Sequence, residues 1–217
     1  MQPGINTWLV GLTAVAVVSD SMLIPFYPHF FAAVYGISDP GYVGAYIAAS
    51  CLAIILAFPL WALVARRVEV LHLLIHTQLA AAVLSVLCYW AATPGLFWLF
   101  SLSMLVFKGS YLLVYPLILR RAEQSLHARL IGLLSVVVHL GVIFGATLGG
   151  ALLDFVEPGQ IFLVMAAGDL GQTLICVHLI RRHDSAVPAV QASAEGTAHT
   201  TYDVILRLGI VMFMFYC

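Results

Sequence analysis

Two charged side chains stand deep inside long apolar stretches of the chain, where a charge is costly and therefore points to chemistry. Asp20 and Lys108 each lie roughly 18 Å into their stretch if it is helical, at about 1.5 Å per residue. A carboxylate that is exposed first to one side of a membrane and then to the other can load and release a proton. Lys108 can hold Asp20 ionised until a substrate binds, or it can recognise an anionic substrate itself. A purely structural ion pair is the third interpretation.

Two further polar residues lie in such stretches, and each has two interpretations. Asp169 is either a second proton carrier or a packed residue that is hydrogen-bonded beside two glycines. Histidine is the residue type most suited to proton exchange near neutral pH, which makes His139 a candidate for proton coupling, although an interhelical hydrogen bond is the simpler role for it. The candidate residues for proton coupling and substrate binding are therefore Asp20, Lys108, Asp169 and His139.

The composition shows which elements carry these residues. Hydrophobic residues make up 63% of the 217 and charged residues 9%, with a mean hydropathy of +1.05, which is too apolar for a soluble fold. A helix needs roughly 20 apolar residues to cross about 30 Å of hydrocarbon, and unbroken apolar runs favour helices over barrel strands. Six such runs lie near residues 8–31, 42–64, 70–92, 96–119, 130–155 and 160–180. The sequence predicts an all-α integral membrane protein with a bundle of six helices.

Basic residues occur in alternate connections between these runs. They follow the second, fourth and sixth runs or open a seventh: Arg66, Arg67, Arg120, Arg121, Arg129, Arg181, Arg182 and Arg207. The intervening connections, 36–41, 93–95 and 156–159, contain none. Because Lys and Arg near helix ends stay on the cytoplasmic side, we expect a multi-pass protein of the cell membrane with a cytoplasmic N-terminus.

The C-terminal part of the chain differs in composition from the rest. After a six-helix unit over residues 1–180, residues 181–203 are polar and rich in Ala, Ser and Thr, which is typical of a cytoplasmic linker. Residues 204–217 begin a seventh apolar run that is too short to cross a membrane. Six helices, an inner linker and the start of a seventh helix are the outline of one half of a twelve-helix transporter, with its 3+3 repeat.

A ladder of glycines in the fifth run carries the most specific pattern. Its members are Gly132, Gly141, Gly145, Gly149 and Gly150, with Ala146 between them. Glycines four residues apart form one smooth helix face on which another backbone can pack closely. This spacing resembles the fifth-helix motif of proton-coupled antiporters of the major facilitator superfamily, in which proline is usual at the position of Ala146.

Two weaker motifs fit the same resemblance. Arg66 and Arg67 are what remains of the family's loop between the second and third helices, where Ala65 stands in place of an acid. Lys108 followed by Gly109 resembles a basic motif of the fourth helix, with Lys where Arg is usual. Because the first and fourth helices line the central cavity in this family, the resemblance makes Asp20 and Lys108 neighbours across it.

The resemblance implies a transporter that works by alternating access, with proton-coupled efflux of a small molecule as the first interpretation. Its expected partners are a small-molecule substrate, protons, the lipid bilayer and a second six-helix half, with no nucleic acid and no cofactor. An importer and a non-transporting scaffold or truncated product are the alternatives. An enzyme is not expected, and the pair His72 and His76 lacks a third clustered ligand, so we expect no metal site.

Prolines and aromatic residues inside the runs have weaker implications. Four prolines are expected to bend or interrupt spans: Pro25 and Pro28 in the first, Pro59 in the second and Pro116 in the fourth. Five aromatic residues form either a pocket for an apolar ligand or ordinary packing: Tyr27, Tyr46, Phe107, Tyr111 and Tyr115.

Overall fold

The computed structural model describes residues 3–121 and 124–183, and this part of the chain consists of helices joined by short turns, without a strand. Six of its helical segments are long and apolar enough to cross a membrane: Thr7–Tyr35, Pro40–Val64, Val70–Tyr89, Pro94–Arg120, Gln124–Leu153 and Pro158–Arg181. The predicted fold class is confirmed, and the spans end within a few residues of the predicted positions. The predicted linker beyond residue 183 and the predicted seventh helix over 204–217 lie outside the described residues.

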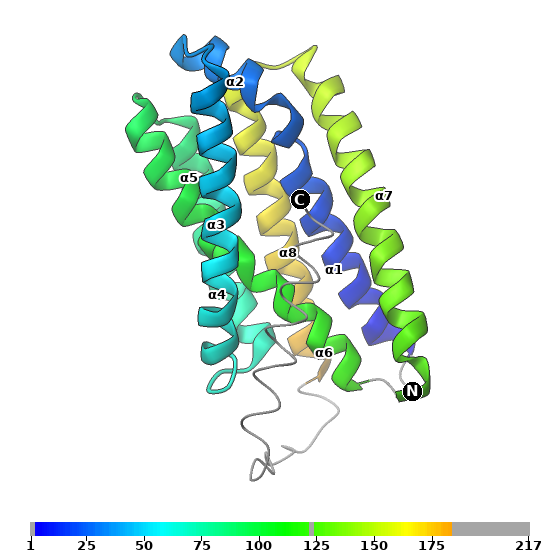
Figure 1. Ribbon diagram of the computed structural model, residues 1–217. Helices are drawn as coiled ribbons and strands as arrows, with labels where there is room; N and C mark the ends of the chain where they lie inside the picture. Colours follow the sequence, from blue (N-terminus) through cyan, green and yellow to red (C-terminus); the bar gives the residue numbers. More distant parts are fainter. Residues whose placement is uncertain (1–2, 122–123, 184–217) are drawn as a thin grey trace.

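Most spans are single α-helices, and two are interrupted (Figure 1). The α-helices are α1 (Pro3–Ser21), α2 (Tyr27–Tyr35), α3 (Pro40–Val64), α4 (Val70–Tyr89), α5 (Pro94–Lys108), α6 (Val114–Arg121), α7 (His127–Leu153) and α8 (Ile161–His183). Short 3-10 helices connect or precede them: η1 (Ile24–Phe26), η2 (Gly109–Leu113), η3 (Gln124–Leu126) and η4 (Pro158–Gln160).

The interruptions occur only partly where the prolines predict them. The first span breaks at η1, which contains Pro25, and α2 resumes with Pro28 in its first turn, as expected. The fourth span breaks at η2, so Pro116 lies in the first turn of α6, after the break. Pro59 lies inside α3, which continues to Val64, so the expected interruption there is wrong. Membrane helices tolerate proline where neighbouring groups satisfy the freed carbonyl.

Local sequence explains several helix ends. The Asp39 side chain accepts hydrogen bonds from two backbone N–H groups of the first turn of α3, and Pro40 begins the helix. The Thr93 hydroxyl caps α5 in the same way, again followed by a proline. Gly36 ends α2 with a φ of 67°, a left-handed conformation that favours glycine. These caps fix the short turns that hold the spans antiparallel.

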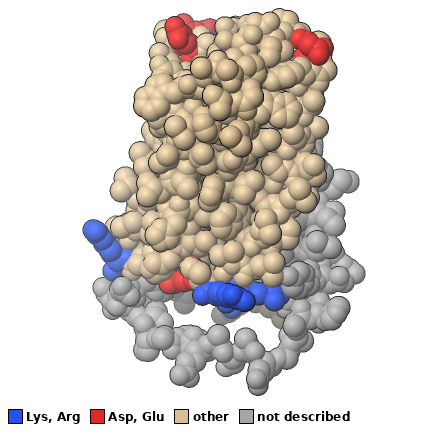
Figure 2. Space-filling model, turned by 90° about the vertical axis from the view of Figure 1, so that its left-hand side faces the viewer, with Lys and Arg blue, Asp and Glu red and all other residues tan. Residues whose placement is uncertain are grey.

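The helices pack so that α1 and α8 lie in the middle of the bundle, as Figure 1 shows. α1 contacts α7 and α8, α4 contacts α8 and α5, and α3 packs on α5. On the face shown in Figure 2, basic side chains lie at one end, and no charged side chain lies over the tall middle band. The N-terminal end of α1 lies at this basic end (Figure 1). The uncharged band is the surface expected of a protein that spans lipid.

Candidate functional site

Lys108, the last residue of α5, donates hydrogen bonds to two carboxylates from two other helices. Its Nζ lies 2.6 Å from Oδ1 of Asp20 on α1 and 2.7 Å from Oδ1 of Asp169 on α8. The Lys108 side chain is 3% exposed, Asp20 16% and Asp169 0%. We call these three residues the charged cluster. The structure brings Asp20 and Lys108 together, and it adds Asp169 to the same ion pair.

Further polar side chains support Asp169. The hydroxyl of Ser85 on α4 donates to Oδ2 of Asp169 at 3.3 Å, and Nε2 of Gln172 lies 3.4 Å from its Oδ1. Both donors are buried. Sequence reasoning missed Ser85 and Gln172, although each is a polar residue inside an apolar span. Together with Ser85, the charged cluster therefore connects four spans through α1, α4, α5 and α8.

A close helix crossing places the two carboxylates near each other. A Cβ atom added to Gly168 of α8 would collide with the Oγ of Ser19 on α1 and lie 2.9 Å from its Cβ. Ser19 and Gly168 immediately precede Asp20 and Asp169 in the sequence. Because only a residue without a side chain fits at position 168, this crossing lets both aspartates reach one lysine.

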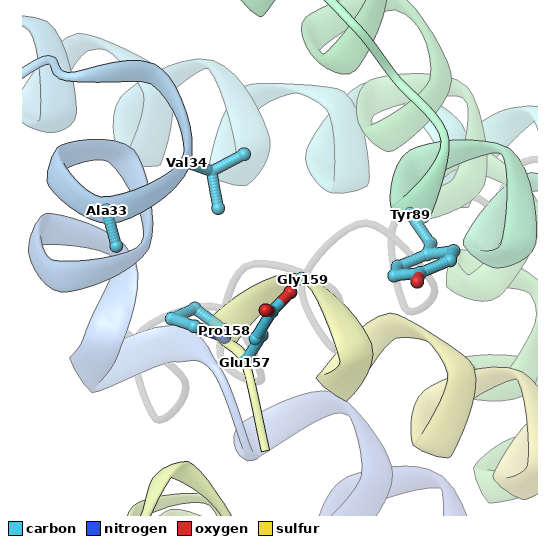
Figure 3. A pocket seen from close by; sticks show the side chains of 6 residues that line it. All are labelled: Ala33, Val34, Tyr89, Glu157, Pro158 and Gly159. Atoms are coloured by element: carbon cyan, nitrogen blue, oxygen red, sulfur yellow. The ribbon is translucent and has the colours of Figure 1, made fainter.

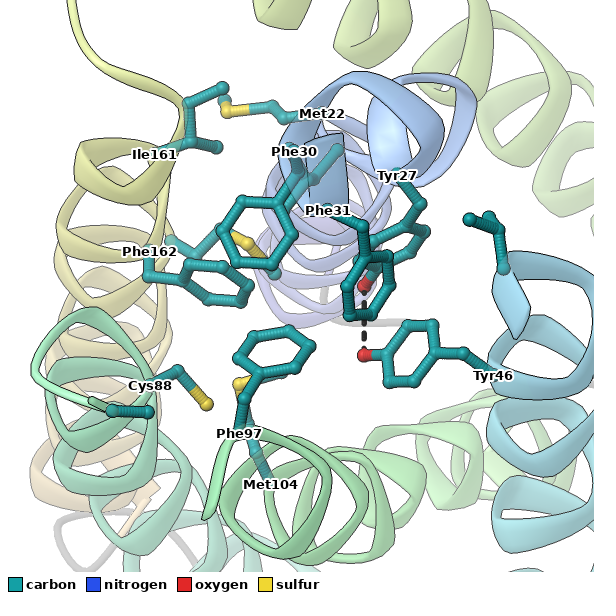
Figure 4. Close-up of a cluster of buried hydrophobic side chains, with 14 of the residues drawn as sticks. Met22, Tyr27, Phe30, Phe31, Tyr46, Cys88, Phe97, Met104, Ile161 and Phe162 are labelled. Carbon is teal, nitrogen blue, oxygen red and sulfur yellow. Dashed lines mark hydrogen bonds between the residues drawn. The ribbon is translucent and has the colours of Figure 1, made fainter. Parts of the chain in front are cut away.

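Hydrophobic side chains enclose the charged cluster from both ends. Toward the ends of α2 and α5 that lie opposite the basic end is an aromatic cluster, shown in Figure 4, that contains Tyr27, Phe30, Phe31, Tyr46, Phe97 and Phe162. Toward the basic end lies an aliphatic cluster that contains Leu9, Leu12, Leu71, Leu74, Ile118 and Leu179. Apolar surroundings of low dielectric strengthen the attraction between the ammonium and the carboxylates, and they make an unpaired charge costly.

The five aromatic residues singled out in the sequence do not line one pocket. Tyr27 and Tyr46 pack in the aromatic cluster with their hydroxyl oxygens 3.4 Å apart (Figure 4). Tyr111 and Tyr115 belong to the aliphatic cluster at the other side of Lys108. Packing, rather than a shared aromatic pocket, is thus their role in this structure.

The glycine ladder lies against the first span at four of its five positions, two of them on α1 itself. A Cβ at Gly141 would lie 3.0 Å from Val17, and one at Gly145 would lie 2.5 Å from the Val18 carbonyl oxygen. The remaining positions differ: Gly149 faces the backbone of Met22, Gly150 faces Phe26, and Gly132 is exposed with open space around it. The ladder therefore seats α7 on the helix that carries Asp20, and Gly132 takes no part in that contact.

His139 does not join the charged cluster. Its side chain is exposed, and its Nδ1 lies 2.7 Å from the carbonyl oxygen of Ser135, one turn earlier in α7. This contact lies within α7, and the expected interhelical hydrogen bond of His139 stays a prediction. His139 lies two positions before Gly141, which is about 200° around the axis, so the histidine points away from α1 when the glycines face it.

The loop between α3 and α4 lies at the basic end of the bundle. Arg66 and Arg67 are exposed in a turn after Val64. His72, at the start of α4, pairs with Glu69 at 3.0 Å in an exposed position. Within the described residues no group of three or more His, Cys, Asp or Glu side chains is placed to hold a metal ion.

A shallow hollow opens at the opposite end, near the turn that precedes α8. Figure 3 shows its lining residues: Ala33, Val34, Tyr89, Glu157, Pro158 and Gly159. Glu157 is the one charged residue of this lining. None of the three residues of the charged cluster lines this hollow.

The charged cluster has a definite chemical capacity. With all three side chains ionised it carries one more negative than positive charge, so it can take up one proton or one positive charge. Protonation of either carboxylate would leave the other paired with Lys108. A buried ion pair is a poor way to stabilise a protein, which favours a functional role for this arrangement.

Comparison with known proteins agrees with the helical architecture. The sequence model described as Major Facilitator Superfamily matches residues 9–216, nearly the whole chain. A search of curated proteins finds no match. From residue 9 onward the match runs through all six spans, and it includes every residue of the charged cluster and the glycine ladder.

Proposed function

Because the chain belongs to the Major Facilitator Superfamily and is a membrane transporter of that type, we propose that it uses protons to drive efflux of a small molecule. The observation that carries the proposal is the buried charged cluster near the middle of the membrane, which holds one exchangeable negative charge in excess. The glycine ladder supports efflux over uptake through its resemblance to the antiporter motif. The family consists of transporters rather than enzymes.

The proposed mechanism assigns the moving proton to Asp20. Its carboxylate is the more exposed of the two, at 16% against 0% for Asp169. A proton that binds Asp20 removes its attraction to Lys108, and loss of the proton restores it. If the bundle faces one side of the membrane with Asp20 protonated and the other with Asp20 ionised, proton flow is coupled to the conformational change.

Alternating access further requires a second body against which this bundle can move. We propose that a second six-helix half supplies it, since carriers of this kind rock two such units around a site at the midplane. The basic end of the bundle is proposed to be cytoplasmic, which places the N-terminus inside the cell. The cell membrane is the proposed location.

A flux assay on the complete carrier tests the proposal. The carrier is reconstituted in liposomes, a pH gradient is imposed, and a panel of cationic, neutral and anionic compounds is followed. We expect gradient-driven movement of at least one compound and its loss in Asp20→Asn. Asp154→Asn, an exposed aspartate at the end of α7, is the matched control and should transport normally. Full gradient-driven flux in Asp20→Asn would refute the assignment of Asp20.

A further inference from the structure

The two carboxylates of the charged cluster are not equivalent, although both bind the same ammonium. Asp169 accepts hydrogen bonds from three side chains, those of Lys108, Ser85 and Gln172. For Asp20, Lys108 is the one side-chain donor among the residues that the structure describes. Asp169 is fully buried, whereas Asp20 is partly exposed. Burial by itself disfavours the ionised form of a carboxylate, and hydrogen-bond donors stabilise that form, so the three donors of Asp169 oppose the effect of its burial.

The helices add to this asymmetry. Asp169 lies on α8, which packs along α4, and α4 packs in turn along α5, so Lys108 and Asp169 belong to one closely packed set of helices. Ser85 of α4 donates to Asp169 and also contacts the Met104 sulfur of α5 at 3.0 Å. Asp20 approaches the pair from α1, through the crossing of Ser19 and Gly168. α1 also packs on α8, but loss of the Asp20 contact alone would leave the Lys108–Asp169 pair and its donors on α4 and α8 intact.

We propose that Asp169 is the fixed counterion of Lys108, a positioning residue that keeps the ammonium charged and in place while Asp20 exchanges the proton. The role of Asp20 in this proposal rests on the proton-coupled function above. Because Asp169 stays bound, the Lys108 ammonium keeps a carboxylate partner when Asp20 is protonated. The ammonium is then not free to bind an anion. Asp169 is thus neither a second proton carrier nor a residue that only fills space.

Other ionisable groups face the cluster from neighbouring helices. The Cys88 thiol of α4 interacts electrostatically with Lys108, and the Tyr27 phenol of α2 with Asp20. The hydroxyl of Tyr46 of α3 donates a hydrogen bond to the hydroxyl oxygen of Tyr27. Thiols and phenols are ordinarily neutral near neutral pH, so Asp20 and Asp169 are the two groups whose exchange of a proton the test must separate.

The sequence supplies a direct reporter, because Lys108 is the only lysine in the chain. The 217-residue chain is labelled with ¹⁵N-lysine, purified and placed in lipid nanodiscs, and the Lys108 side-chain resonance is recorded from mildly acidic to mildly alkaline pH. In the unchanged protein we expect one ammonium signal that is protected from solvent exchange throughout this range. A signal that exchanges rapidly with water at the acidic end of this range would overturn the proposal.

Two matched variants test the asymmetry. Asp20→Asn should keep the protected ammonium signal with a changed chemical shift, and Asp169→Asn should lose it. Asp154→Asn controls for a neutralised aspartate elsewhere and should leave the spectrum unchanged. Equal losses in both cluster variants, or a loss in Asp20→Asn alone, would overturn the proposal. If Asp169→Asn does not fold, the Asp20→Asn spectrum decides alone: a retained protected signal supports the fixed counterion, and a lost one refutes it.

This experiment is independent of transport. An Asp20→Asn carrier with normal gradient-driven flux would refute the proposed function, yet the Lys108 spectrum could still show Asp169 as its fixed partner. Conversely, loss of the protected signal in Asp20→Asn together with loss of flux would refute the fixed counterion and leave the proton-coupled function supported. The flux assay and the Lys108 spectrum can therefore each refute their own proposal without refuting the other.

Discussion

Replacing Gly145 with alanine tests whether the glycine ladder sets the distance between α1 and α7. The added Cβ would lie 2.5 Å from the carbonyl oxygen of Val18 and 3.0 Å from the Cβ of Ser21. Real Cβ contacts essentially never fall below 3.0 Å, so α1 must move by at least about 0.5 Å. A backbone carbonyl cannot rotate away as a side chain can. The clash must therefore be relieved by moving the helix and loosening its contacts.

The size of the effect follows from overpacking in other close-packed interiors. Forcing an extra carbon into such a contact typically costs about 1–3 kcal/mol. Alanine also favours a helix over glycine by up to about 1 kcal/mol, which partly conceals the clash. Gly132→Ala is the matched control, because Gly132 lies in the same helix and has nothing within 4 Å of an added Cβ. The difference between the two variants isolates the clash, at about 1–3 kcal/mol.

Both variants are to be measured by reversible unfolding in mixed micelles, with helicity followed by circular dichroism. Gly132→Ala should be as stable as the parent protein or slightly more stable, and Gly145→Ala should be less stable. Gly149→Ala, whose Cβ would collide with the backbone of Met22, should be at least as destabilised as Gly145→Ala. Free energies of unfolding that agree within about 0.5 kcal/mol for positions 132 and 145 would refute this account of the ladder.

Three further substitutions test other contacts by the same unfolding measurement. Lys108→Met leaves two buried carboxylates without their shared cation and should cost about 3–5 kcal/mol; an unchanged stability would mean that water reaches the cluster freely. Trp61→Phe removes the indole N–H that donates to the Val106 carbonyl oxygen at 2.6 Å, and a loss of about 1 kcal/mol is expected. Asp39→Ala removes the cap of α3 and should cost about 1 kcal/mol, which hydrogen exchange at the start of that helix can localise; unaltered exchange there would contradict the capping role.

The architecture was predictable because the bilayer imposes it. A run of apolar residues long enough to cross the membrane must be helical, since its backbone groups have no other partners. Depth along each helix follows from the rise per residue, so the approximate level of Asp20 and Lys108 could be inferred without coordinates. A hydrophobic run does not show how the helix is rotated about its own axis, and so it does not show which side chains face the bundle interior. This is why the role of Asp169 remained open between a proton carrier and a packing residue.

The three residues of the charged cluster come together through tertiary contacts that no local sequence pattern predicts. Asp20 and Lys108 are 88 positions apart, and Lys108 and Asp169 are 61 apart. They converge because Gly168 allows α8 to contact α1 closely at Ser19. The sequence alone does not show which helix packs against a single glycine in an apolar run. His139 shows the converse, because its position relative to the glycine face could have been worked out from the helical period alone.

α1 is held between two close contacts on opposite sides, and this arrangement leads to a last prediction. Gly168→Ala should push α1 away from α8, and Gly145→Ala should push it away from α7, so the double variant leaves the helix no direction in which to relax. The loss of unfolding free energy in the double variant should therefore exceed the sum of the two single losses, with a coupling of about 0.5–3 kcal/mol in a double-mutant cycle. The pair Gly132→Ala and Gly168→Ala is the control and should be additive. Additivity for positions 145 and 168 would mean that α1 can shift along its axis or bend to escape both clashes, and that it is not clamped where it carries Asp20.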